Sequence, residues 1–92
     1  MTSAQELMTQ AIEVGAPLYN QGNSEACFKV YRNTHQLLEG KNELCKPVRD
    51  ALGQGLLRAT TLEGWRPKAW ALRDSFDGLL IVIFKRLEQP QP

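Results

Sequence analysis

The sequence predicts an all-α protein of four helices, packed as an antiparallel bundle or as two stacked helical hairpins. Apolar residues recur at helical spacing in four segments, capping residues and prolines mark where these segments begin, and glycines mark where they end. The links between the segments are short, which favours antiparallel neighbours. We expect one helical domain over residues 1–89 and a disordered tail at residues 90–92, where the chain is Pro-Gln-Pro.

The first helix is predicted to begin at Ser3, because Ser3 and Glu6 have the spacing of a capping box. An apolar stripe follows: Leu7, Met8, Ala11, Ile12, Gly15, Leu18 and Tyr19. Pro17 has no amide hydrogen for the preceding turn, so a kink or a break is expected near residues 13–17. Gly22 is expected to close this helix in a left-handed cap.

The second helix is predicted from an N-cap at Asn23 or Ser24 to about Glu39, with Gly40 at its end. Its apolar stripe consists of Cys27, Val30, Tyr31, Thr34, Leu37 and Leu38. The third helix has Pro47 in its first turn and ends before Gly64. Two glycines inside it, Gly53 and Gly55, each lower helix propensity by about 1 kcal/mol relative to alanine, which suggests close packing or a bend.

Residues 11–38 resemble a tetratricopeptide repeat. The slots that carry the likeness are Gly15, Tyr19, Gly22, Cys27, Tyr31 and Thr34. Pro17 departs from the pattern, and the closing proline expected near Glu39 is missing. A second copy, shifted by 42 residues so that Gly22 falls on Gly64, matches only weakly. The resemblance implies a helical hairpin and, in that family, the binding of peptides.

The fourth helix is predicted to start at Pro67 and to carry the inward stripe Leu72, Phe76, Leu79, Leu80, Ile83 and Leu87. One side of a helix cannot hide the six consecutive apolar residues 79–84. Trp70, Ile81 and Phe84 lie away from the inward stripe or at its margin, and they form a second apolar face. Such patches mark contact surfaces, so this face predicts a homodimer or a groove for a partner helix or peptide, with Trp70 as the anchor.

The sequence gives little support to metal or disulfide chemistry. His35 and Cys27 are eight residues apart, about 12 Å along a helix, so they cannot ligate one metal ion. We expect a partly buried His35, with the charged form favoured by the C-terminal helix dipole. Cys27 and Cys45 are expected to be too far apart for a disulfide, with Cys27 shielded and Cys45 accessible.

No catalytic motif is present, so we expect a protein that is not an enzyme and has no catalytic residue, metal or cofactor. Asp74 and Asp77 could pair as two carboxylates but are interpreted as solvated charges. The start of the fourth helix mixes cations with aromatic residues, as nucleic-acid sites do. We favour packing and solvated charges for this cluster, which consists of Trp65, Arg66, Lys68, Trp70 and Arg73.

Composition excludes several classes of function. Eleven basic residues against 10 acidic ones create no field for nucleic acid or an anionic membrane. The longest apolar run is six residues, against roughly 20 for a membrane-spanning helix, and two cysteines are too few for a disulfide framework. A soluble, cytoplasmic protein-interaction module is therefore expected. The alternative is a bundle that encloses a small apolar ligand or cofactor, lined by Tyr19, Tyr31, Leu56 and Phe76.

Overall fold

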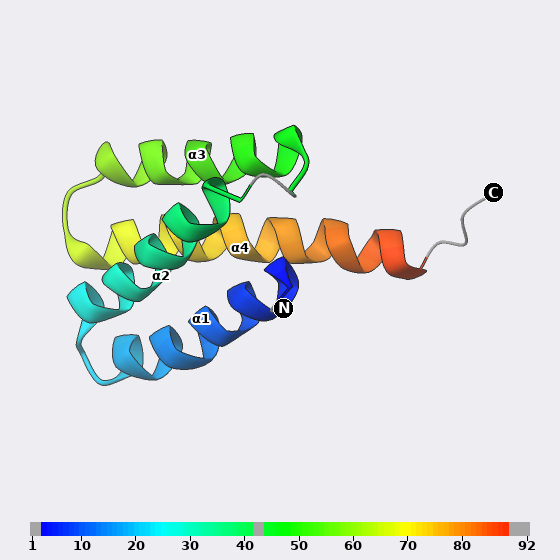
Figure 1. The fold of residues 1–92 in the computed structure, drawn as a ribbon. Coiled ribbons are helices and arrows are strands. Elements are labelled where there is room, and N and C mark those ends of the chain that lie inside the picture. The colour runs from blue at the N-terminus through cyan, green and yellow to red at the C-terminus, as the bar shows by residue number, and fades with distance from the viewer. Residues whose placement is uncertain (1–2, 42–43, 89–92) are drawn as a thin grey trace.

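The protein forms four helices and, in the described part of the chain, no strand. The computed structural model describes residues 3–41 and 44–88, and the side chains of these residues as far as Val82. The helices are α1 (Ala4–Asn20), α2 (Ser24–Glu39), α3 (Lys46–Thr60) and α4 (Trp65–Glu88). Successive helices run in opposite directions, so that an α1–α2 hairpin packs against an α3–α4 hairpin (Figure 1). The predicted all-α fold of four helices is confirmed.

Two helices, α2 and α4, each pack against all three others, and α4 is the longest of the four. Its 24 residues correspond to about 36 Å of helix, whereas the 15 residues of α3 correspond to only about 22 Å. The C-terminal part of α4, orange to red in Figure 1, therefore runs past the ends of α1 and α3. The tail predicted for residues 90–92 lies outside the described residues.

Most helix starts agree with the capping signals. The amide of Glu6 donates to Ser3 Oγ at 3.1 Å, and the amide of Ala26 donates to Asn23 Oδ1 at 3.3 Å. Pro47 lies in the first turn of α3, as predicted. The fourth helix begins at Trp65, two residues earlier than predicted. Pro67 still lies in the first turn. Backbone amides there have no acceptor within the helix, so the amide hydrogen that proline lacks removes no hydrogen bond.

The break predicted near Pro17 is wrong. The first helix continues as one α-helix to Asn20, and the amide of Gln21 donates to the Pro17 carbonyl at 3.0 Å. Pro17 is one turn from the end of the helix and exposed, so its ring disturbs a single turn next to solvent.

Two of the three glycines predicted at helix ends are in left-handed conformations. Gly22 has a φ of 87° and Gly64 a φ of 91°, backbone angles that residues other than glycine rarely adopt. Gly40 also ends its helix, but its φ of −80° is right-handed and accessible to any residue.

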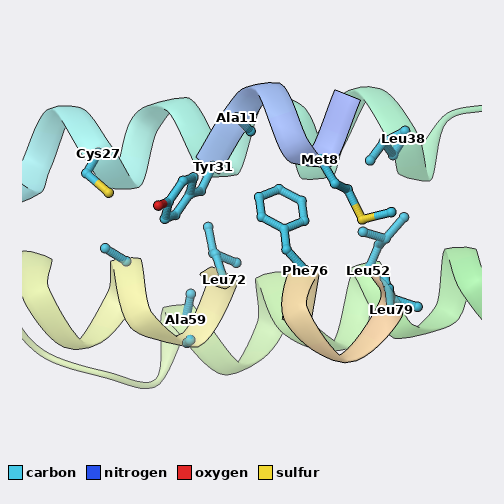
Figure 2. Close-up of a cluster of buried hydrophobic side chains, with 12 residues drawn as sticks. Met8, Ala11, Cys27, Tyr31, Leu38, Leu52, Ala59, Leu72, Phe76 and Leu79 are labelled. Carbon is cyan, nitrogen blue, oxygen red and sulfur yellow. The ribbon is translucent and has the colours of Figure 1, made fainter. Parts of the chain in front are cut away.

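The core is built around the inward stripe of α4. Leu72, Phe76 and Leu79 are buried as predicted, and Figure 2 shows the Phe76 ring pointing from α4 towards the space between Tyr31 and Met8. The side chains of Ile83 and Leu87 lie outside the described part. In α2 the stripe includes Leu38 but not Leu37, which is 54% exposed. The inclusion of Leu37 is wrong because it is about 120° around the helix from Tyr31, whereas Leu38 is about 20° away.

Glycines inside the helices mark close contacts between them. A Cβ at Gly15 would collide with the Tyr31 ring, so glycine lets α2 lie directly against α1 at this point. A Cβ at Gly55 would lie 2.8 Å from Ser75 Oγ on α4 and 3.4 Å from His35 Nε2 on α2. Close packing thus accounts for the glycine at position 55 of α3.

Candidate functional site

Trp70 is bound to the end of α1. Its Nε1 donates to the Tyr19 hydroxyl at 2.9 Å, and the two rings meet edge to face, with centroids 5.8 Å apart and planes at 77°. Edge-to-face pairs of this kind add to the stability gained from area burial. The indole is nevertheless 49% exposed. Trp70 is therefore held in position by Tyr19 while about half of it remains exposed to solvent.

Arg66 binds the same tyrosine. Its Nε donates to the Tyr19 hydroxyl at 3.1 Å, and its guanidinium carbon lies 5.4 Å from the centre of the Tyr19 ring. The hydrogen bond from Arg66, and after it the one from Trp70, lowers the pKa of Tyr19 below its usual value, because both stabilise the phenolate. With two donors bound to its oxygen, the Tyr19 hydroxyl can still donate its own hydrogen.

Trp70 and Tyr19 border a cavity of about 180 Å³ where α1, α2 and α4 meet. Its lining consists of Ala16, Tyr19, Asn20, Cys27, Tyr31, Ala69, Trp70 and Arg73. Burial raises the pKa of Tyr31 to about 12, and burial also raises the pKa of the Cys27 thiol. Both groups are therefore neutral at neutral pH. Among the described side chains that line the cavity, Arg73 is the charged one.

Ile81 and Val82 are exposed apolar residues in the C-terminal half of α4. Ile81 is 56% exposed and Val82 is 49% exposed. Val82 also lines an open groove between α3 and α4, whose walls include Ala51, Gly55, Ala71, Ser75 and Gly78. The side chain of the third predicted contact residue, Phe84, lies outside the described residues.

A charged pair interrupts the predicted second apolar face. At 100° per residue, Trp70 and Ile81 point in directions only about 20° apart, but Asp77 lies within about 40° of both and between them along the helix. Asp77 Oδ1 accepts a hydrogen bond from Arg73 Nε at 3.0 Å. The geometry does not join Trp70 and Ile81 in one continuous apolar surface. Instead it gives two separate features, the cavity beside Trp70 and the exposed pair Ile81–Val82.

His35 differs from its prediction. It is completely buried rather than partly buried, and its ring stacks on Phe76 with centroids 4.2 Å apart. Nδ1 lies 2.9 Å from the Tyr31 carbonyl, so Nδ1 carries the hydrogen and donates it. Burial lowers the pKa of His35 to about 4, since a charge there would lose its hydration, and the bond to Tyr31 offsets this only in part. The expectation of a charged form stabilised by the helix dipole is wrong.

The other residues considered for chemistry have structural contacts. Lys68 donates to the Ala59 carbonyl at 2.9 Å, and the Trp65 ring lies against Phe28 with centroids 5.6 Å apart. Asp74 lines the α3–α4 groove, on a different side of α4 from the cavity. The described residues contain no group of three side chains able to hold a metal ion. Both cysteines are free, Cys27 buried and Cys45 exposed, as predicted.

The four residues proposed to line an enclosed ligand site do not all line one cavity. Tyr19 and Tyr31 line the cavity beside Trp70. Phe76 is in the core, and Leu56 lines an open groove with Glu39 and Lys46. Sequence reasoning missed the role of Arg73 as a cavity wall and the exposure of Val82. Helical spacing could have shown that Arg73 lies within one turn of Trp70, but only the packing of α1 shows that the two share a cavity.

The chain matches no protein-family model, no curated protein and no solved structure. Within the described ranges, none of the helices has the length and apolar character needed to cross a membrane. Proposals about function therefore depend on the geometry given above.

Proposed function

We propose that this chain is a non-catalytic helical interaction module that self-associates through the C-terminal part of α4. The observation that supports it is the exposure of Ile81 and Val82, side by side on a helix that continues past the rest of the bundle. The chain's own fold leaves about half of each of these adjacent aliphatic side chains in contact with solvent. A second copy related by a twofold axis would supply the same surface and cover both.

The sequence around this pair supports the same site. Leu79 to Phe84 are all apolar, and the structure buries Leu79 while leaving Leu80 only half-buried. Grooves between helices also accept single amphipathic helices. We prefer a second copy of this chain because its own α4 is long, apolar over this stretch and free of proline after Pro67 until Pro90.

The expected affinity is modest. Fully burying an exposed Ile or Val side chain contributes roughly 1.5–3 kcal/mol, but Ile81 and Val82 are already about half covered, so two such residues from each copy contribute about 3–6 kcal/mol before other terms. Association itself costs an estimated 4–15 kcal/mol. The gain reaches only the low end of that cost, so a dimer in the micromolar to millimolar range requires further contact area along α4 besides these two residues.

A location in the cytoplasm is part of the same proposal. Both thiols are free, and one of them is exposed at the start of α3. Free exposed thiols persist in reducing compartments.

Sedimentation velocity over roughly 10–500 µM protein tests the self-association, where the wide range is chosen because of the modest affinity expected. The wild type should show a sedimentation coefficient that rises with concentration. Ile81→Glu should sediment as a monomer throughout, with its helical circular dichroism retained, because a carboxylate at the contact would have to be desolvated.

The matched control is Val14→Glu, which places the same charge at another exposed aliphatic residue, 55% exposed on α1. It should associate like the wild type. A wild-type protein that stays monomeric at the highest concentration would contradict the proposal. So would equal effects of the two glutamate variants.

A further inference from the structure

We propose that the cavity beside Trp70 binds a small molecule that has one aromatic ring and a carboxylate group. This cavity is at the opposite end of the bundle from the surface proposed for self-association, and it involves α1, α2 and the first turns of α4. The inference does not depend on the oligomeric state. Size, wall chemistry and charge each restrict the ligand class.

The size of the cavity fits one ring. Its volume is about 180 Å³, close to the roughly 150 Å³ of an engineered cavity that binds benzene. Sites for drug-sized ligands and cofactors start at about 300 Å³. A nucleotide, a flavin or a porphyrin would extend far outside this half-open cavity, whereas a benzene ring with one substituent fits inside it.

The walls are aromatic and are held in place before a ligand arrives. Tyr19 accepts hydrogen bonds from Arg66 and Trp70, which fix the angle between its ring and the indole. The Tyr31 ring is wedged against Gly15 and meets Phe76 edge to face at 5.6 Å. Small residues, Ala16 and Ala69, leave the space between these rings empty. Aromatic rings prefer offset or edge-to-face contacts with other rings, so a planar aromatic ligand suits these walls.

Charge selects an acidic substituent. Arg73 lines the cavity, where it interacts with the Tyr31 hydroxyl, and its Nε donates to Asp77. A guanidinium has five N–H donors, so donors remain for a ligand. Arg66 stands one turn before Trp70 and forms no ion pair within the described ranges. Arg66 is not part of the cavity lining, but it is bound to the hydroxyl of Tyr19, which is, so the two guanidinium groups near the cavity exceed the single carboxylate paired with Arg73. Guanidinium binds carboxylates in a planar two-point geometry, which a neutral or basic substituent cannot use.

Benzoate is the probe that tests this inference, with benzyl alcohol and benzylamine as neutral and cationic ligands of similar size. A Trp65→Phe background leaves Trp70 as the sole tryptophan, so its fluorescence reports on the cavity directly. Benzoate should give a saturable change with a dissociation constant on the order of a millimolar, as expected for a ligand of so few atoms. Benzyl alcohol should bind at least tenfold more weakly, and benzylamine should not saturate.

Two variants locate the binding. Ala16→Leu should fill the cavity and abolish the response, whereas Val14→Leu, on the exposed side of the same helix, should leave it unchanged. Arg73→Gln should reduce benzoate affinity to that of benzyl alcohol while the affinity for benzyl alcohol stays the same. Amide chemical shifts of the wild type provide a readout independent of folding defects, and benzoate should move the resonances of Ala16, Asn20 and Ala69.

Three results would overturn the inference. One is an absence of saturable change with benzoate at tens of millimolar, and the second is equal affinity for benzoate and benzyl alcohol. The third is a set of shifted amides centred on Val82 rather than on Ala16, which would move the binding to the α3–α4 groove.

Discussion

The two ends of the bundle are held in different ways. At the end where α1 turns into α2 and α3 into α4, two glycines in left-handed conformations make tight turns, and Tyr19 binds both Arg66 and Trp70. At the other end the last part of α4 continues past α1 and α3 (Figure 1), and Ile81 and Val82, in the C-terminal half of this helix, are about half exposed. We call these the closed end and the open end.

The difference shows that apolar character alone does not identify a contact surface. Trp70 and Ile81 have similar exposed fractions, 49% and 56%. Trp70 has a hydrogen-bond partner and a ring partner within its own chain, whereas Ile81 has no aromatic or polar group to hold it. An exposed residue that is held by contacts within its own chain, such as Trp70, is suited to form the wall of a small binding site. An exposed residue without such contacts, such as Ile81, is suited to pack against another protein.

The largest contrast is expected between alanine substitutions on the two parts of α4. Phe76→Ala should lower the free energy of unfolding by about 3–5 kcal/mol, because Phe76 is completely buried and its removal leaves a cavity. Ile81→Ala should change it by less than about 0.5 kcal/mol in dilute solution. Urea unfolding followed by circular dichroism measures both, with Phe76→Leu as a milder core variant if Phe76→Ala does not fold. Similar losses for Phe76→Ala and Ile81→Ala would contradict the exposed position of Ile81.

Acid should destabilise the protein through His35. The unfolded chain binds a proton at His35 near the ordinary histidine pKa of 6.5, whereas in the folded protein burial lowers that pKa to about 4. Between these values the unfolded state holds more protons, so stability falls as the pH is lowered, by up to about 3 kcal/mol from this group. Urea titrations at about pH 7.5, 6 and 5 should show this loss, and His35→Gln should show less of it. An identical pH dependence in His35→Gln would mean that other groups are responsible.

A smaller contrast is expected between the glycines at the two ends. Gly22→Ala should destabilise the closed end by about 1–2 kcal/mol, since φ is 87° and a Cβ meets no atom that could compensate. Gly40→Ala, where φ is −80° and a Cβ would be 3.7 Å from its nearest neighbour, should be neutral or stabilise by up to about 1 kcal/mol. Thermal melts of the two variants give the comparison directly. Equal melting temperatures would contradict the left-handed cap at Gly22.

Local signals in the sequence were sufficient for most of the fold. Helix starts depend on contacts within a single turn, and the starts predicted from Ser3, Asn23 and Pro47 are present. Pro17 was misjudged because the effect of a proline depends on how much helix follows it. Leu37 and Leu38 are adjacent in sequence, so a stripe defined by approximate spacing included both although the helix buries only one.

The candidate sites were less predictable because they depend on contacts between distant residues. Trp70 and Tyr19 are 51 positions apart, and periodicity within α4 cannot show that they share a hydrogen bond. Helical spacing did place Trp70 and Ile81 on one side of α4, but it did not weigh the pair of Arg73 and Asp77 that separates them. The burial of His35 likewise follows from Phe76 on α4 and Gly55 on α3, not from its position near the end of α2.

Intermolecular paramagnetic relaxation tests the central claim, self-association at the open end, most directly. Cys45 is exposed and Cys27 is buried, so a nitroxide reagent should label Cys45 at the start of α3, near the part of α4 that extends beyond its neighbours (Figure 1). Labelled chains at natural isotope abundance are then mixed with ¹⁵N-labelled, nitroxide-free chains. Self-association at the open end predicts broadening of the amides of Leu79 to Val82, and its loss in Ile81→Glu. No broadening at several hundred micromolar, or broadening centred on Tyr19 and Trp70, would contradict it.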